Sequence, residues 1–462
     1  MNTLPPETKS AVRLAGWPRG TKNVDTATIT TSTAQKQAHE VYFDFNRRGS
    51  YWTRNAHGGW IMMNETQVSR KLRASGVSRN RPDGCQVSPL DERLLDIQER
   101  FDVHYAGPLA GYRAGIYTVG EKRILVTESP RLVPPVQGDW PILAKLIAGL
   151  LVDGDCDQRP YFYGWLKVAV EALAKGGIRP GQTLALCGPK DCGKSLLQNL
   201  LTVLLGGRSA KPYQFMAGQT TFNADLFEAE HLQIEDDQSS TDIRARRNFG
   251  TSIKALCVND TQRLHDKGRR AFNGLRPFWR VTITVNDEPE NLMVLPPLDD
   301  SLEDKLMLLR AFRRPMPMPT DSNEERDAFM ATLRGELPAF VHFLMTWVIP
   351  EELRSNRFGV THYHHPELVE AIDSLAPEQK LLLLLDGELF TTPAAGPWHG
   401  TAAELEMRLT GMDSRCAHEA RKLLSWSTAC GVYLGRLAKR MKERIEYTHN
   451  PDSRKWTIRP PR

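Results

Sequence analysis

The sequence predicts an α/β protein whose core is a sheet of short buried strands connected by helices. Three observations support this class. Residues 182–187 form a short apolar run, and after a glycine-rich turn residues 196–204 carry an apolar stripe at helical spacing. Residues 231–237 and 280–286 are strand-like runs that each end in polar side chains. A strand, a glycine turn and a helix in that order are typical of a parallel sheet that binds phosphate at one edge.

Length and composition indicate ordinary globular material divided into several domains. The chain has 462 residues, of which 40% are hydrophobic and 25% charged, and domains typically contain about 100–200 residues. The net charge is only +5, but residues 436–462 hold nine Lys/Arg against three Asp/Glu, and residues 263–280 hold six against one. Both segments are candidates for contact with a phosphate backbone, and a solvated charged face is the alternative for each.

Cysteine usage and hydropathy exclude several other classes. The seven cysteines include no C-x-x-C pair, which argues against a zinc module or a disulfide framework. There is no apolar run of about 18 residues and no secretory signal pattern near residue 1. We therefore expect a protein of the reducing cytoplasm with no membrane partner.

The most informative motif is a phosphate-binding loop at residues 188–195, Gly-Pro-Lys-Asp-Cys-Gly-Lys-Ser, which matches G-x-x-x-x-G-K-[ST] throughout. Two glycines let the backbone curl so that successive N–H groups point at a triphosphate. Lys194 is expected to reach the β- and γ-phosphates and Ser195 to bind Mg²⁺. The residues expected to contact ATP are Gly188, Pro189, Lys190, Asp191, Cys192, Gly193, Lys194 and Ser195.

Acidic and amide side chains follow the next two strands. The run at 231–237 ends in Glu235, Asp236 and Asp237. We predict that Asp236 binds Mg²⁺ and that Asp237 orients the attacking water; the alternative is a shift of one residue, to Glu235 and Asp236. Asn286 ends the later strand, where its amide is placed to hydrogen-bond the water or the γ-phosphate.

A basic turn lies between these two strands. Residues 264–272 read Leu-His-Asp-Lys-Gly-Arg-Arg-Ala-Phe, with glycine at the tip. Lys267, Arg269 and Arg270 form a cationic cluster suited to a sugar-phosphate chain, and such a grip is independent of base sequence.

The phosphate loop, acid pair, basic turn and terminal Asn, in this order, resemble a superfamily 3 helicase of the primase-helicase proteins of phages, satellites and mobile elements. The resemblance is strongest over residues 140–315. It implies an AAA+-like P-loop NTPase core, ATP hydrolysis with Mg²⁺, a homo-hexameric ring, single-stranded DNA in the pore, and action in the cytoplasm of a bacterial host. A partner primase or polymerase is also implied.

The same resemblance implies roles for individual residues. Asp236 and Asp237 match the Walker B pair, Asn286 matches the sensor, and Lys267 matches the DNA-contacting lysine of the pore hairpin. Gly268 stands where relatives carry a histidine.

The trans-acting arginine that completes a neighbouring subunit's site is not settled by the resemblance. Its matching position holds Lys305, which lacks the planar two-pronged geometry of arginine. Arg310, Arg313 or Arg314 are alternatives, and the choice between them stays open.

The flanking regions have less specific patterns. Aromatic residues at 42–60 are typical of a small hairpin, followed by a helix over Glu65–Ala74. The interleaved Arg47, Arg48 and Arg54 admit nucleic-acid contact, but a plain hydrophobic core is the favoured use. Near the C-terminus, three helix-sized segments (401–409, 414–426 and 428–441) precede strands at 444–447 and 455–458, which predicts a winged helix that binds duplex DNA. The expected divisions are a flexible tail 1–36, a small α+β domain 37–135, the ATPase core 136–320, a helical extension 321–390 and a winged-helix domain 391–462.

These features predict an ATP-dependent DNA helicase or translocase that replicates a phage or mobile element. The alternatives are an ATP-switched initiator or loader without processive unwinding, and a defence-type NTPase.

Overall fold

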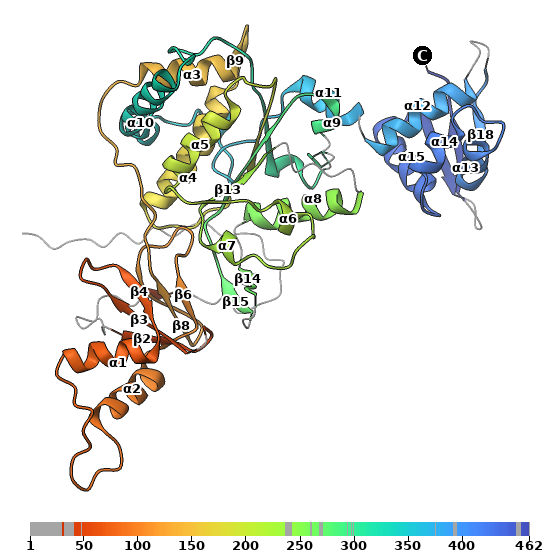
Figure 1. The fold of residues 1–462 in the computed structure, drawn as a ribbon. Helices are drawn as coiled ribbons and strands as arrows, with labels where there is room; N and C mark the ends of the chain where they lie inside the picture. Colours follow the sequence, from red (N-terminus) through yellow and green to blue (C-terminus); the bar gives the residue numbers. More distant parts are fainter. Residues whose placement is uncertain are drawn as a thin grey trace, which may run out of the picture.

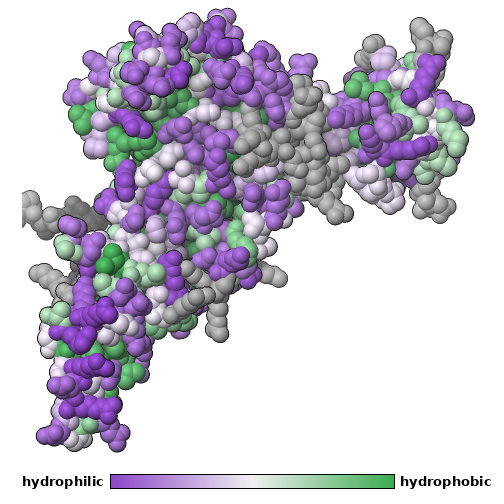
Figure 2. Space-filling model, viewed as in Figure 1, coloured by the Kyte–Doolittle hydropathy of each residue, from purple (hydrophilic) through white to green (hydrophobic). Residues whose placement is uncertain are grey.

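The structure is a computed structural model of the chain. It describes residues 30–31, 41–47, 49–235, 243–258, 261–267, 271–292, 294–296, 298, 300–374, 376–390, 395–449 and 454–461. Figure 1 shows an N-terminal module, a central α/β core and a C-terminal module, in chain order. Polar side chains cover most of the face drawn in Figure 2. Among the described residues, no helix is both long and apolar enough to cross a membrane.

The N-terminal module contains two small sheets. In the first the order is β4 (Trp60–Met63), β3 (Ser50–Arg54), β2 (Val41–Asp44) and β5 (Asp102–Val103). In the second it is β1 (Thr30–Thr31), β7 (Gly115–Val119), β8 (Lys122–Val126) and β6 (Tyr105–Gly107). Helices α1 (Glu65–Ala74) and α2 (Pro89–Arg100) cover the first sheet through a shared apolar cluster. The small α+β region expected from the sequence is therefore present. Within the expected tail, Thr30–Thr31 pair with β7, and the tail's other residues lie outside the described ranges.

The central sheet is parallel throughout its five strands. Its spatial order is β12 (Ser209–Ala210), β13 (His231–Ile234), β16 (Arg280–Val285), β11 (Thr183–Cys187) and β17 (Leu306–Arg310). Because the strands are parallel, their carboxyl ends meet at one edge. The phosphate loop after β11 and Asn286 after β16 consequently lie on neighbouring strands, with Glu235 after β13 one strand further.

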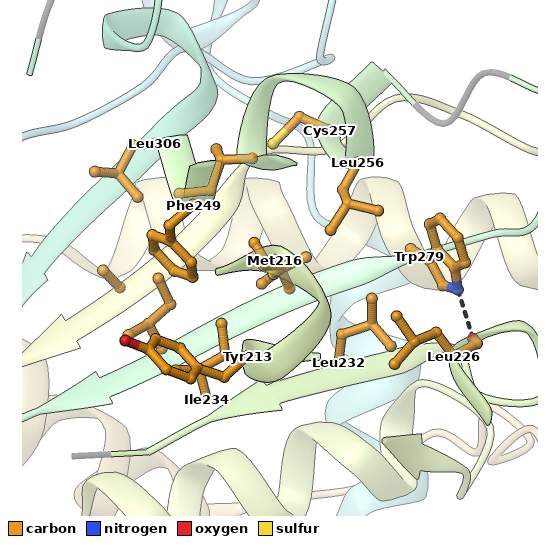
Figure 3. Close-up of a cluster of buried hydrophobic side chains, with 14 of the residues drawn as sticks. Tyr213, Met216, Leu226, Leu232, Ile234, Phe249, Leu256, Cys257, Trp279 and Leu306 are labelled. Carbon is orange, nitrogen blue, oxygen red and sulfur yellow. Dashed lines mark hydrogen bonds between the residues drawn. The ribbon is translucent and has the colours of Figure 1, made fainter. Parts of the chain in front are cut away.

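Helices cover both faces of this sheet, as side-chain alternation along β11 requires. Leu184 and Leu186 pack in a cluster with α3 (Pro141–Leu151), α4 (Arg159–Ala174), α5 (Lys194–Leu204) and α10 (Asn323–Thr346). Ala185 and Cys187 face the other cluster, which includes residues of α6 (Tyr213–Met216), α7 (Ala224–Phe227), α8 (Ile243–Val258), α9 (Pro289–Leu292) and α11 (Pro366–Ser374). Figure 3 shows this second cluster, in which Trp279 Nε1 donates a 2.7 Å hydrogen bond to the Leu226 carbonyl.

The basic turn belongs to a two-stranded hairpin, β14 (Gln262–Leu264) and β15 (Phe272–Leu275). Its buried residues join the same apolar cluster as Val119 and Ile124 of the N-terminal module, and Figure 1 shows the hairpin beside that module. A Cβ added to Gly274 would lie 3.2 Å from Val119. The base of the hairpin thus packs against both the N-terminal module and the core.

The C-terminal module has a hydrophobic core of its own. It consists of α12 (Pro377–Leu389), β18 (Trp398–Thr401), α13 (Ala402–Thr410), α14 (Ala417–Leu423), α15 (Ala429–Arg440), β19 (Ile445–His449) and β20 (Arg454–Ile458), with the strands in the order β18, β20, β19. The expected three helices and two strands are confirmed, whereas β18 was not predicted. Residues of α12 share this core, so the helix packs here although the sequence placed it in the preceding extension.

Candidate nucleotide-binding site

The phosphate loop is built around two glycine positions that no other residue fits easily. A Cβ at Gly188 would lie 2.1 Å from the Ala311 carbonyl oxygen, because the loop starts directly against the end of β17. Gly193 has φ +104°, in the left-handed region, and its position immediately precedes α5. Asp191 is also left-handed, with φ +58°. The loop therefore turns sharply and delivers the N-terminus of α5 to the strand edge, which is the backbone geometry that favours an anion.

Lys194 connects the loop to the neighbouring strand. Its ammonium group donates to the carbonyls of Gly188, at 2.8 Å, and Pro189, at 2.7 Å. It also donates to Asn286 Oδ1 at 3.0 Å. The side chain is buried. The structure thus brings together the lysine and the asparagine that the sequence assigned to one site, although 92 positions separate them.

An acidic side chain, Glu235, lies at this sheet edge directly after β13. Glu235 lines the same cavity as Lys194 and Ser195, and its carboxylate forms an ion pair of 3.0 Å with Lys211. Asp236 and Asp237 lie outside the described residues. The acid pair therefore stays a prediction, and among the described residues Glu235 is the acid that lines the cavity.

A cavity of about 690 Å³ opens over the loop. One wall is the loop itself with Glu235, Thr284 and Asn286. The other lining residues come from α10 and the segment before it: Met316, Thr320, Arg326, Phe329 and Met330. The lining includes the cationic Lys194, apolar side chains such as Phe329 and Met330, and the hydroxyl of the exposed Ser195. This combination fits a nucleotide with its metal ion.

Arg326 is a cavity residue that the sequence analysis missed. Its Nε donates to the Thr320 carbonyl at 2.8 Å, which orients the guanidinium in the cavity lining. No spacing rule links it to the phosphate loop, because it arrives on a helix much later in the chain. A capping box at Ser322 and Glu325 marks the start of that helix, but not which side chain faces the site.

A buried polar network joins α5 to the two strands that end in functional groups. His231 Nδ1 lies 2.7 Å from Thr202 Oγ1, and its Nε2 lies 2.7 Å from Thr282 Oγ1. Gln198 Nε2 also donates to Thr282 Oγ1, at 2.9 Å. Burial lowers the pKa of His231 to about 3, so the ring is neutral at physiological pH. The network fixes the helix that carries Lys194 relative to β13 and β16.

The candidates for a trans-acting cation lie at different places. Lys305 precedes β17, at the opposite edge from the phosphate loop, and its ammonium contacts Asp304 at 2.5 Å and the Ser301 carbonyl at 2.8 Å. Arg310 ends β17 and pairs with Glu367 of α11. Arg314 pairs with Asp153 at 2.5 Å, and Arg313 is exposed. None of the four lines the cavity described above.

The predicted DNA-contacting cluster is described in part. Lys267 is exposed at the turn of the hairpin, whereas Gly268, Arg269 and Arg270 lie outside the described residues. The hairpin leads into the amino end of β16, and Asn286 follows its carboxyl end. Lys267 and the phosphate loop are therefore at opposite edges of the sheet.

Comparison with known proteins gives a likeness of fold. No protein-family model matches the chain, and no curated protein does. An apo structure of the NrS-1 C-terminal region is similar with a TM-score of 0.52 at 12% identity, covering 91% of this chain and 96% of that chain. Its A form gives a TM-score of 0.50 with the same identity and coverage. The chain thus shares this fold along most of its length.

Two helicase structures are more distant. JCV helicase has a TM-score of 0.25 at 16% identity, covering 54% of this chain and 67% of that chain. The active helicase Cch of SCCmec type IV has a TM-score of 0.29 at 9% identity, covering 88% and 73%. At these scores neither supports an argument about this chain.

Proposed function

We propose that this protein is an ATP-dependent DNA helicase or translocase of the superfamily 3 type, serving the replication of a phage or mobile element. The observation that carries the proposal is the meeting of Lys194, Ser195, Glu235 and Asn286 around one cavity at a sheet edge. The sequence order of loop, acids, basic hairpin and sensor amide adds the resemblance to that class of motor. The strand order, with β16 between β11 and β13, suits an AAA+-like core.

The nucleotide chemistry follows from the residues at the cavity. ATP would place its phosphates against the loop and Lys194, with Mg²⁺ held by Ser195 and a strand-end acid, Asp236 or Glu235. The metal supplies charge neutralisation of the phosphates. A second acid, Asp237 or Asp236, would accept a proton from the attacking water, and Asn286 would orient that water or report loss of the γ-phosphate.

The nucleic-acid chemistry is assigned to two separate surfaces. The hairpin with Lys267, Arg269 and Arg270 would grip the phosphates of a single strand in the pore of a homo-hexamer. The C-terminal module, with its helices and ribbon, would act as a winged helix on duplex DNA. Basic residues Lys439, Arg440 and Lys442 at the end of α15 support this assignment.

Strand displacement on a forked duplex tests the proposal. Lys194→Ala is expected to abolish both ATP hydrolysis and unwinding. Lys267→Ala is expected to keep at least half of the basal hydrolysis but lose about ten-fold or more in unwinding, because the grip is a charge contact. The matched control is Lys145→Ala, an exposed lysine on α3, which should leave both activities intact.

Two outcomes would redirect the assignment. Duplex binding with ATP hydrolysis but no strand displacement would indicate an initiator or loader that uses ATP to assemble. Hydrolysis that neither unwinds nor responds to DNA would contradict the helicase, the initiator and the DNA-recognising defence NTPase, and would leave only a nucleotide hydrolase.

A further inference from the structure

One aromatic ring of the N-terminal module is not used in its core. The sequence offered two uses for the aromatics at 42–60, a hydrophobic core or nucleic-acid contact. Tyr42, Tyr51 and Trp52 are buried, as the core interpretation requires. Phe45, in the turn after β2, is 43% exposed. This ring therefore needs a different explanation from its neighbours.

Phe45 is fixed in place next to the hairpin. Its ring packs edge-on against the His104 ring, with centroids 4.9 Å apart. The His104 ring in turn packs against Phe272 of β15, with a centroid distance of 6.5 Å. The Asn46 side chain donates to the His104 carbonyl at 2.8 Å. The backbone N–H groups of Asn46 and Arg47 both donate to Asp44. The turn is consequently rigid, so little order would be lost on binding.

Two cations lie over other aromatic rings of the same region. Arg47 follows Phe45 in the turn and lies 5.9 Å from the Trp52 ring centroid. The exposed Lys122 sits with its ammonium 5.3 Å from the Phe272 ring centroid, on the hairpin side. The nearby carboxylate of Asp102 lies 3.8 Å from Arg123, which offsets its charge. Burial lowers the pKa of His104, so its ring adds no positive charge at neutral pH. The surface therefore combines the exposed Phe45 ring with Arg47 and Lys122 on neighbouring rings.

The surface is continuous with the hairpin. Phe272, which contacts both His104 and Lys122, pairs with Leu264 across the hairpin, and Lys267 lies three residues beyond Leu264. The carboxylate of Glu228 interacts with Arg47 and with the carboxylates of Asp225 and Asp266, so the region is of mixed charge. A chain held at Lys267 would reach Lys122 and Arg47 of the N-terminal module past these acids. Exposed aromatic rings bordered by Lys and Arg are the usual means of holding unstacked bases.

We propose that the N-terminal module binds a single-stranded polynucleotide, with Phe45 stacking on a base and Arg47 and Lys122 contacting phosphates. The site extends the path that begins at Lys267. The inference rests on the proposed function for its ligand, but it does not depend on ATP hydrolysis. It gives the N-terminal module a role that the motor assignment leaves open.

Equilibrium binding by the full chain without nucleotide tests the site. The probe is fluorescently labelled dT20, and anisotropy gives the dissociation constant. Phe45→Ala is expected to weaken binding about ten-fold, within the range for loss of one stacked base, while Phe45→Trp should retain it. The Trp variant should also show quenching by dT20 but not by an abasic strand of equal length. Leu95→Ala, another exposed apolar residue of the module, is the matched control.

A second variant isolates the charge contribution. Arg47→Ala with Lys122→Ala should weaken binding and reduce the slope of log affinity against log salt by about one to two. Parallel titrations with rU20 identify whether DNA or RNA is preferred, and dependence on Phe45 with either strand supports the site. Unchanged melting temperatures of the variants exclude unfolding as the cause.

The outcomes separate this inference from the proposed function. Equal binding by Phe45→Ala and Leu95→Ala, alongside a clear loss in Lys267→Ala, would overturn the N-terminal site and leave the motor assignment standing. Failure of the unmodified protein to bind any single strand would overturn both.

Discussion

His231 is a histidine whose two ring nitrogens are both engaged inside the protein. Thr202 and Thr282 hold them from α5 and β16 at 2.7 Å each. A neutral ring has one donor and one acceptor, and each hydroxyl supplies the complement. Protonation would place a positive charge on a ring that is shielded from water. Burial therefore disfavours the protonated form and lowers the pKa of His231 to about 3.

This histidine should make stability depend on pH. A histidine in the unfolded chain has a pKa of about 6.5. Below that pH the unfolded chain binds a proton at this residue, whereas His231 in the folded protein stays neutral. The contribution is complete above pH 6.5 and is lost progressively as the pH falls toward 3. Between pH 7 and pH 5 the free energy of unfolding should fall by about 2 kcal/mol on account of this group. Urea titrations of the protein at the two pH values measure it.

The control is a substitution that removes the titrating ring. His231→Gln should lower stability at pH 7 but remove that part of the pH dependence, whereas His57→Gln, on the exposed surface, should keep it. Identical pH dependence in all three proteins would show that His231 is not held neutral.

At the scale of the element, helix α10 places the Arg326 guanidinium in the cavity over the loop that joins β11 to α5. We expect Arg326→Ala to weaken ATP binding about ten-fold or more, since a hydrogen bond to a charged group contributes roughly 1.5–3 kcal/mol. A fluorescent ATP analogue gives the dissociation constant, and steady-state hydrolysis gives KM and kcat. Arg334→Ala, exposed on the same helix, serves as the control. Nucleotide affinity that stays the same in both variants would remove Arg326 from the site.

The elements that the sequence predicted well are those with local signals. Asn64 and Gln67 form a capping box at α1, whose bounds match the expected helix over Glu65–Ala74. The glycine pattern of the phosphate loop likewise placed the junction of β11 and α5 within one residue. In both cases the determining interactions lie within a few positions of each other in the chain.

Elements fixed by distant partners were harder to predict. The run Met307–Leu309 had a recognisable apolar character, but its place beside β11 depends on register with Thr183–Cys187. β18 is four residues long and includes Gly400, and it is fixed by pairing with residues 455–458, which lie more than 50 positions later in the chain. Arg326 is the same case at the site, because only the packing of α10 brings it to the phosphate loop.

At the scale of the whole molecule, the C-terminal module is the most separable part. It has its own buried cluster, and α11 and α12 carry the chain from the core into it. We expect a chain ending at Ser374 to retain ATP hydrolysis within about two-fold, because no residue beyond that point lines the cavity. Its affinity for a 30-base-pair duplex should fall about ten-fold or more, given the loss of the basic α15 and ribbon.

Duplex binding and hydrolysis by the same preparation check this expectation. A truncated chain that binds duplex as tightly as the full chain would contradict a winged-helix role, and one that loses hydrolysis as well would indicate that the module supports the core.

The central position of β16 restricts how this strand can move. All six of its residues are buried, and it is hydrogen-bonded to β11 on one side and β13 on the other. Such a strand cannot slide lengthwise without breaking both ladders at once. In the proposed motor, a change at Asn286 would therefore reach the hairpin through movement of the sheet as one unit, and not through sliding of β16 alone.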